Sequence, residues 1–114
     1  MKDLVDNGLL YDFYGELLTD HQRNIYESAV YDDMSLNEIA GEQGISRQGV
    51  HDLIKRCTAT MEGYEDKLHM VKRYKEISDN VQKLKAVAAD KSLGKDELIE
   101  EINRIADTII EELS

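Results

Sequence analysis

Residues 36–55, LNEIAGEQGISRQGVHDLIK, carry the pattern from which the rest of the chain is interpreted. Two amphipathic segments flank Gly44, and glycine accepts the left-handed backbone of a tight turn between helices. Ala40 is small enough for the second helix to cross close to the first, and Ile45 is expected to fill the corner. The inner face of the second helix is expected to carry Val50 and either Leu53 or Ile54. This spacing predicts a helix-turn-helix; the alternative is a plain helical hairpin in a bundle.

Three capping signals divide the first half of the chain into four helices. Thr19 with Gln22, and Ser35 with Glu38, have the spacing of a capping box, in which a hydroxyl and a side chain three residues on satisfy exposed amides. Ser46 is the expected cap of the helix that follows the turn. The helix before Thr19 is expected to turn these residues inward: Leu9, Leu10, Phe13, Tyr14, Leu17 and Leu18.

Beyond the turn, apolar residues recur every three or four positions as far as residue 89. This stripe predicts either a single helix over 47–89 or two helices that break near Gly63. A loop over 90–94 then precedes a last helix that begins near Lys95 and packs antiparallel on the preceding one, within the chain or across a dimer. The expected seam of this last helix is Leu98, Ile102, Ile105, Ile109 and Leu113, widened by Ile99, Ala106 and Ile110.

The composition favours an all-α protein. Of 114 residues, 41% are hydrophobic and 33% are charged, proline is absent and glycine numbers 7. A formal net charge of -10 at pH 7 excludes general electrostatic attraction of the whole protein to nucleic acid, so any contact with nucleic acid requires a local basic surface. The single cysteine, Cys57, excludes an intrachain disulfide and lies on the apolar stripe, where a buried thiol is expected.

The chain is interpreted as one domain over 1–114 with two functional parts. Residues 1–62 form the helix-turn-helix unit, and residues 63–114 form a C-terminal helical hairpin that is a candidate dimerisation arm. The dimer is expected because the long helix carries apolar residues on more than one stripe, and the last helix covers only one side of it. The alternative is a chain that folds back at Gly63 and covers the same residues itself.

The second helix of the motif carries the candidate nucleic-acid site. Arg can bind guanine with two hydrogen bonds, Gln can bind adenine, and Asp can accept a bond from cytosine. A helix N-terminus with a serine cap, together with basic side chains, can bind phosphate. Because this helix carries only three basic side chains in that region, Arg47, Lys55 and Arg56, we expect a monomer to bind nucleic acid weakly and in a salt-sensitive manner. The candidate contact residues are Ser46, Arg47, Gln48, His51, Asp52, Lys55 and Arg56.

No pattern in the sequence indicates catalysis, a cofactor or a metal site. The three histidines are scattered away from any ligand-like spacing, and the glycines do not form a phosphate-binding loop. The N-terminus lacks the pattern of a signal peptide, and no apolar run approaches the length of a membrane span. A non-enzymatic protein of the cytoplasm is therefore expected.

Several short segments resemble the promoter-reading region of bacterial sigma factors: Leu18-Thr19, Gln22-Arg23, Asp32-Asp33, Ser35-Leu36, Glu38-Ile39-Ala40, Gly44-Ile45-Ser46 and Val50. The acidic first half and the long tail after Lys67 depart from that region. The whole chain, from the segment 9–18 to Arg47-Gln48-Gly49-Val50, is more similar to the YlxM-like family of helix-turn-helix proteins from Gram-positive bacteria.

This resemblance implies a regulatory or accessory protein that binds nucleic acid or a ribonucleoprotein, with a role in the signal recognition particle pathway, and it brings no active site. The alternative function is a protein–protein adaptor in which the helix-turn-helix serves only as a scaffold. The acidic surface favours the adaptor, whereas the polar set on the second helix favours the nucleic-acid target.

Overall fold

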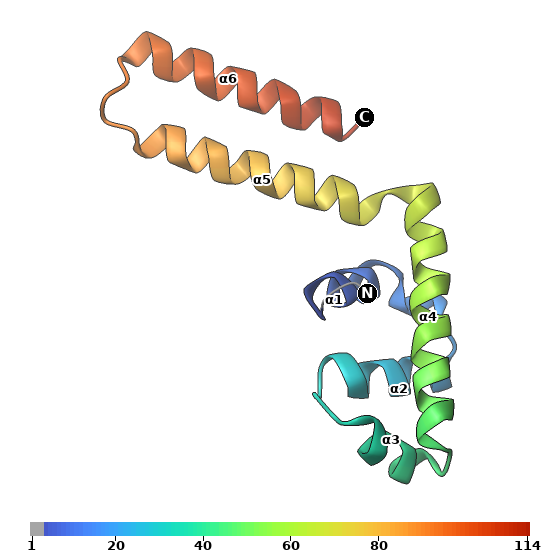
Figure 1. The fold of residues 1–114 in the computed structure, drawn as a ribbon. Helices are drawn as coiled ribbons and strands as arrows, with labels where there is room; N and C mark the ends of the chain where they lie inside the picture. The colour runs from blue at the N-terminus through green and yellow to red at the C-terminus, as the bar shows by residue number, and fades with distance from the viewer. Residues whose placement is uncertain (1–3) are drawn as a thin grey trace. The chain divides into compact units, whose positions relative to one another are not determined.

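The computed structural model describes residues 4–114, with side chains from Asn7 onward, and every regular element in that range is helical (Figure 1). The prediction of an all-α fold is therefore confirmed. The elements in chain order are α1 (Leu4–Tyr14), the short 3-10 helix η1 (Gly15–Leu17), α2 (Asp20–Val30), α3 (Leu36–Gln43), α4 (Arg47–Leu68), α5 (Met70–Ala89) and α6 (Lys95–Glu112).

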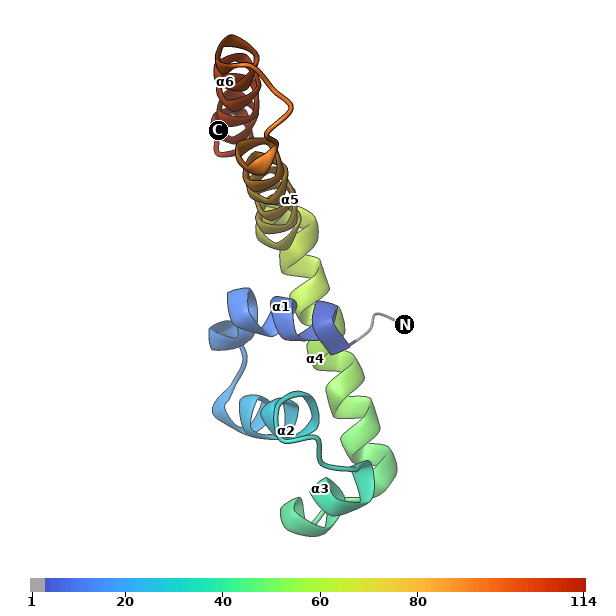
Figure 2. The same ribbon diagram turned by 90° about the vertical axis from the view of Figure 1, so that its left-hand side faces the viewer.

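The chain divides into two compact units, residues 1–69 and residues 70–114. In the first unit, α1, α2 and α3 each pack on α4, and Figures 1 and 2 show them following one another along it. The second unit is the antiparallel pair of α5 and α6. None of the described helices is long and apolar enough to cross a membrane.

The predicted helix starts are confirmed by their hydrogen bonds. Thr19 and Gln22 form the complete capping box, with each side chain accepting a bond from the other residue's backbone amide. Ser35 Oγ accepts from the Glu38 amide at 3.1 Å, and Ser46 caps α4 in the same way. These bonds satisfy donors that the helix itself leaves open, which fixes where each helix begins.

Helix α1 ends earlier than its apolar pattern indicates. Leu10, Tyr14 and Leu18 are buried as predicted, but the α-helix stops at Tyr14 and tightens into η1. Because a 3-10 turn advances fewer residues per turn than an α-helix, the residues after Tyr14 rotate out of register. The prediction that Leu17 faces inward is therefore wrong, and its side chain is 57% exposed.

The long stripe is two helices, and the break follows Leu68 rather than Gly63. His69 adopts the left-handed conformation, with φ 57°, and its amide donates to the Glu65 carbonyl at 2.8 Å. Packing on α1 continues across Gly63, because Met61 is fully buried before it and Glu65 accepts a 2.6 Å hydrogen bond from the Tyr14 hydroxyl after it. A glycine inside a helix costs about 1 kcal/mol, and these contacts offset it.

The predicted antiparallel packing of the last helix on the preceding one is confirmed within the chain. Ile105 is buried at the centre of the seam, and the amide of Asn80 on α5 donates to the carboxylate of Glu112 on α6. The prediction that Leu113 belongs to the inner seam is wrong, since it lies beyond the last turn of α6 and is 66% exposed. The half-buried seam residues are Leu98, Ile102 and Ile109.

Tyrosine hydroxyls join α1 to the other helices of the first unit. The hydroxyl of Tyr11 donates to Glu27 Oε1 at 2.6 Å, and that of Tyr31 donates to Asp12 Oδ1 at 2.5 Å. The rings of Tyr11 and Tyr26 stack with their centroids 5.4 Å apart. Burial raises the pKa of Tyr11, Tyr26 and Tyr31, and the acceptor carboxylates of Glu27 and Asp12 raise the pKa of Tyr11 and Tyr31 further.

These raised pKa values predict that stability falls in alkaline solution. The unfolded chain releases the tyrosine protons near the ordinary pKa of 10.0, whereas the folded chain retains them to higher pH. The unfolded state then binds fewer protons, so the stabilisation is complete below pH 10 and is lost as the pH rises through the folded values. Urea unfolding between about pH 8 and pH 11 measures this loss. The Tyr31→Phe variant should lose less stability over the range, and an identical pH profile would contradict the assignment.

Candidate nucleic-acid interface

The turn between α3 and α4 is built around Gly44. Its φ of 68° and ψ of 31° lie in the left-handed region, which a glycine occupies without a Cβ clash. The amides of Gly44 and Ile45 both donate to the Ala40 carbonyl, at 3.0 and 3.2 Å. Ser46 then caps α4, its Oγ accepting from the Gly49 amide at 2.9 Å. The turn is therefore closed entirely by local bonds, as the sequence predicts for a helix-turn-helix.

A small apolar cluster holds the two helices together. Ile25 of α2, Ile39 of α3 and Val50 of α4 are each fully buried, with Ala40 and other partly buried residues packed around them. The predicted inward roles of Val50 and Ala40 are thus confirmed, and both Leu53 and Ile54 pack on the cluster. The prediction that Ile45 fills the corner is wrong. Ile45 is 37% exposed, because it follows the left-handed residue and lies beside Gly49 instead.

Gly49 is the tightest point of the turn. A Cβ at this position would lie 3.1 Å from Ser46 Oγ and 3.9 Å from Ile45 Cδ1. A larger residue would therefore press on the capping hydroxyl at the first turn of α4. The glycine keeps the cap and the start of the candidate surface in place.

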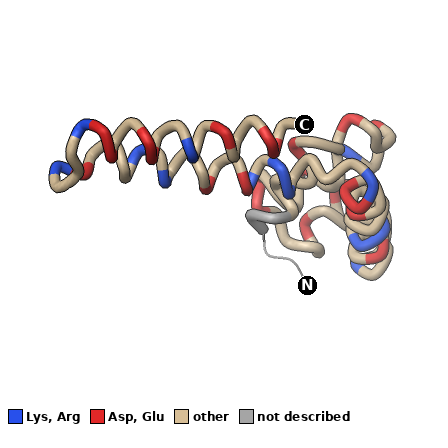
Figure 3. Tube along the Cα trace, turned by 90° about the horizontal axis from the view of Figure 1, so that it is seen from above, with Lys and Arg blue, Asp and Glu red and all other residues tan. Residues whose placement is uncertain are grey.

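The seven candidate contact residues lie together at the start of α4, and all seven are exposed. Arg47, His51 and Lys55 are four residues apart, so they form one row along the helix surface. Gln48 and Asp52 form a second row beside it. Figure 3 shows the Lys and Arg positions of the chain among its more numerous acidic ones.

The two side chains of the second row, Gln48 and Asp52, are hydrogen-bonded to each other. Gln48 Nε2 donates to Asp52 Oδ1 at 2.9 Å, and His51 Nδ1 lies 3.7 Å from the same oxygen. Both side chains of the histidine–aspartate pair are more than half exposed, so these contacts are readily exchanged for water or a ligand. Contact of Gln48 with an adenine, or of Asp52 with a cytosine, would require breaking the bond between them.

The surroundings of the candidate surface are acidic. Helix α3 exposes Glu38 and Glu42 and carries no lysine or arginine. The basic side chains Arg47 and Lys55 of α4 therefore form a narrow positive strip rather than a broad patch, while Arg56 continues the row of Gln48 and Asp52. A narrow strip favours a few specific contacts over general attraction to a polyanion.

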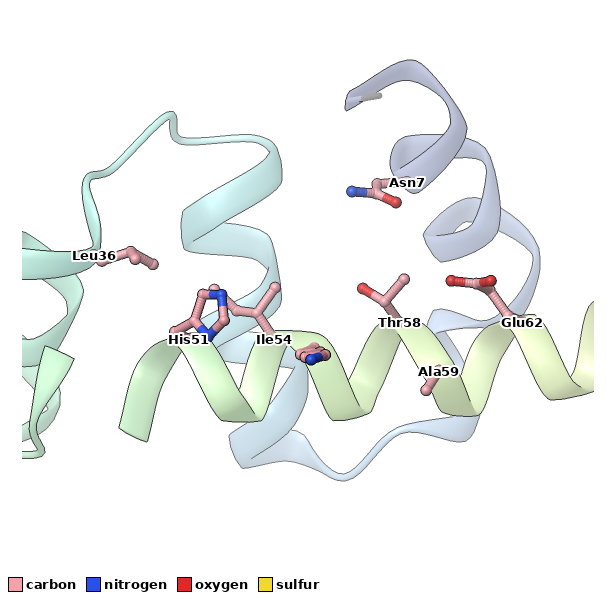
Figure 4. A pocket seen from close by; sticks show the side chains of 8 residues that line it. Asn7, Leu36, His51, Ile54, Thr58, Ala59 and Glu62 are labelled. Carbon is pink, nitrogen blue, oxygen red and sulfur yellow. The ribbon is translucent and has the colours of Figure 1, made fainter. Parts of the chain in front are cut away.

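A pocket of about 620 Å³ opens beside this strip, within the first unit (Figure 4). His51 and Lys55 belong to both its wall and the candidate contact row, and Asn7 lines it from α1. The Oδ1 atom of Asn7 is buried and has no hydrogen-bond partner among the described residues. Nothing in the spacing of the sequence indicated the pocket, because its walls come from three helices. The remaining lining residues are Leu36, Ile54, Thr58, Ala59 and Glu62.

Two other features of the described residues concern Cys57 and the residue types that bind metals. Cys57 is fully buried as predicted, and burial raises the pKa of its thiol, which disfavours the reactive thiolate. In the part of the chain that the structure describes, no three His, Cys, Asp or Glu residues are grouped so as to hold a metal ion.

The fold and the exposed second helix define the chain as a helix-turn-helix protein. A family profile described as "UPF0122: Putative helix-turn-helix protein, YlxM / p13 like" matches residues 2–105. The chain belongs to this family, which is described as a helix-turn-helix family and not as an enzyme family.

Relatives of the chain carry the same family name. A UPF0122 protein of Thermoanaerobacter sp. strain X514 is 52% identical over 77 residues, which are 68% of this chain and 66% of the relative. A UPF0122 protein of Oceanobacillus iheyensis is 45% identical over 82 residues, covering 72% of this chain and 78% of the relative. One of Halalkalibacterium halodurans is 44% identical over 90 residues, covering 79% and 82%.

Proposed function

We propose that this protein binds nucleic acid, free or within a ribonucleoprotein, through the start of α4. The observation that carries the proposal is the exposed row Arg47, His51 and Lys55 on the second helix of a helix-turn-helix. In that motif the N-terminal turns of the second helix contact base edges in the major groove. The capped first turn of α4 adds oriented backbone amides and the Ser46 hydroxyl as phosphate contacts.

The remaining roles follow from the position of each side chain. Arg47 and Gln48, on the first turn, are the proposed base-reading residues, and Asp52 holds the Gln48 amide until a base replaces it. Lys55 and Arg56 lie further along α4 and are the proposed phosphate contacts. His51 stands between the two groups, beside Asp52.

A finer part of the proposal goes beyond binding. The family resemblance adds a regulatory or accessory role in the signal recognition particle pathway. The apolar residues of the C-terminal hairpin add action as a homodimer, and the sequence features described above add a cytoplasmic location. No catalytic step is part of the proposal. A pull-down from cell lysate, with and without nuclease, tests the pathway directly, because it identifies both the proteins and the nucleic acids that are retained.

Binding to nucleic acid is expected to be lost when the two proposed base-reading side chains and the phosphate contact Lys55 are removed. The variant Arg47→Ala, Gln48→Ala, Lys55→Ala changes only exposed side chains, so its melting temperature should stay close to that of the parent. Fluorescence anisotropy at low salt, with a labelled random-sequence DNA duplex and a random RNA oligonucleotide, measures the affinity. Each lost phosphate contact should lower the salt slope on duplex DNA by about 0.9.

A composition-matched variant is the control. Gln82→Ala, Lys83→Ala, Arg104→Ala removes the same residue types from exposed positions of the second unit and should retain binding. Equal losses in the two variants would indicate a nonspecific charge effect and would contradict the proposed site.

The second candidate function is a protein adaptor, and the pocket beside the strip favours it. Leu36, Ile54 and Ala59 give the pocket an apolar wall that a partner's side chain could occupy, next to His51 and Lys55. If the parent has no affinity for either nucleic-acid probe, and the alanine variant loses a nuclease-resistant protein partner, the adaptor function replaces the first proposal.

A further inference from the structure

The helical hairpin of the second unit buries little apolar surface by itself. In residues 70–114, all of which the structure describes, the buried hydrophobic residues are Val71 and Ile105. Helical units of this size need many more buried side chains, a crosslink or association to be stable. The hairpin therefore requires a further surface to pack against.

The uncovered apolar residues of the two helices lie on the same side of the hairpin. On α5, Val81 follows the half-buried Ile77 by four positions, which turns it about 40° from the seam. On α6, Ala106 follows the half-buried Ile102 by four positions and turns in the same sense. Because the helices are antiparallel and face each other, equal rotations from the shared seam lead to one side (Figure 1).

This side is termed the apolar face. Four large side chains on it are well exposed: Val81 at 39%, Ile99 at 47%, Ile110 at 62% and Leu113 at 66%. Soluble monomers rarely leave such a contiguous set uncovered. Opposite rotations lead to a polar side, where the residues are Asp79, Lys83, Glu97, Arg104 and Thr108. The members of the apolar face are Val81, Ala88, Ile99, Ala106, Ile110 and Leu113.

The charges that border the apolar face differ between the two helices. Helix α5 carries five Lys or Arg residues and two acidic ones, whereas α6 carries two Lys or Arg residues and seven acidic ones. Next to the apolar face, the α5 border holds Lys85, and the α6 border holds Asp96 and Asp107, while Lys95 at the start of α6 lies on the face itself. The face thus has one basic edge and one acidic edge.

We propose that the apolar face packs on the same face of a second copy of this chain, with α5 of each copy on α6 of the other. A two-fold axis parallel to the helices produces this arrangement, and it brings each basic edge beside an acidic edge of the partner. A two-fold axis perpendicular to the helices would instead stack α5 on α5 and α6 on α6, which places like charges together. The result is an antiparallel four-helix bundle.

The oligomeric state of the full chain is the first test. Sedimentation equilibrium at micromolar concentration should give twice the 13.0 kDa mass of one chain. Replacing Ile110 by Asp should return the mass to that of one chain while the helical circular dichroism signal remains. A parent protein that stays monomeric over this range would overturn the proposal, and the apolar face would then be covered within one chain.

Reversal of a border charge separates the two arrangements. With α5 on the partner's α6, Lys85→Glu places a carboxylate beside the partner's Asp107, and the dimer dissociation constant should rise about tenfold because the axis repeats the change twice. With α5 on α5, the same variant would remove a lysine–lysine repulsion and tighten the dimer. A tighter or unchanged dimer would therefore overturn the proposed arrangement.

Two further variants complete the test. Lys83→Glu makes the same charge change on the polar side of α5 and should leave the dissociation constant unchanged. The double variant Lys85→Glu, Asp107→Lys restores opposite charges across the interface and should recover most of the lost affinity. Failure of the double variant to recover affinity would contradict the pairing. The inference specifies the homodimer of the proposed function and rests on that part of it. Because it uses residues 70–114 alone, its failure would leave the proposal of nucleic-acid binding through α4 standing.

Discussion

Replacement of Val50 by Asp is expected to unfold the helix-turn-helix unit. Val50 is fully buried between Ile25 and Ile39, where an ionised carboxylate would have neither water nor a partner. The penalty for burying such a group is several kcal/mol, which is comparable with the total stability of about 5–15 kcal/mol of an ordinary domain. Circular dichroism at increasing temperature and urea concentration measures the loss.

Thr60→Asp is the matched control for this prediction. Thr60 lies on the same helix but is exposed, so its carboxylate stays in water and the change in unfolding free energy should stay within about 0.5 kcal/mol. If Val50→Asp melts at the same temperature as Thr60→Asp, the packing of α4 on α2 and α3 is not as described.

The second large effect is expected from Tyr26→Ala. Tyr26 is fully buried, its ring stacks on Tyr11, and its hydroxyl lies 3.1 Å from Thr58 Oγ1. Removing a buried aromatic ring leaves a cavity, and such substitutions cost about 3–5 kcal/mol. The cost should fall on the contacts that hold α1 and α4 to α2. Urea denaturation, monitored by the helical circular dichroism signal, measures the free energy of unfolding.

Tyr26→Phe separates the ring from the hydroxyl. It retains the stacked ring and removes the bond to Thr58, so it should cost about 1 kcal/mol. A phenylalanine variant as unstable as the alanine variant would show that the hydroxyl, rather than the ring, holds these helices together.

The tyrosine contacts combine a local pattern with distant partners. Tyr14 belongs to the predicted apolar seam, and the structure buries it. Its hydroxyl, however, donates to Glu65, a residue 51 positions away, and Tyr31 donates to Asp12 across 19 positions. Helical periodicity identifies which side of a helix faces inward but contains no information about which distant residue it meets.

In the candidate site, too, local spacing was predictable and contacts between distant residues were not. The row of Arg47, His51 and Lys55 is a consequence of helical spacing and was predicted as an exposed set. The bond between Gln48 and Asp52 is also local, at four positions, and its spacing alone could have predicted it. The pocket beside the row was not predictable, because Asn7 and Leu36 reach it from α1 and α3.

Helix starts, the Gly44 turn and the amphipathic sides of the helices were all evident in the residues themselves. The reason is that caps, turns and helical faces depend on bonds and spacings within about four residues. The break at His69 and the outward positions of Leu17, Ile45 and Leu113 were not evident, because they depend on where each helix ends: η1 replaces the last turn of α1, Ile45 follows the left-handed Gly44, and Leu113 lies beyond α6. Long-range packing decided whether α4 continues through a glycine. Gly63 is the clearest case: its local preference favours a break, but Met61 and Glu65 pack or hydrogen-bond on either side of it, and these long-range contacts keep α4 continuous.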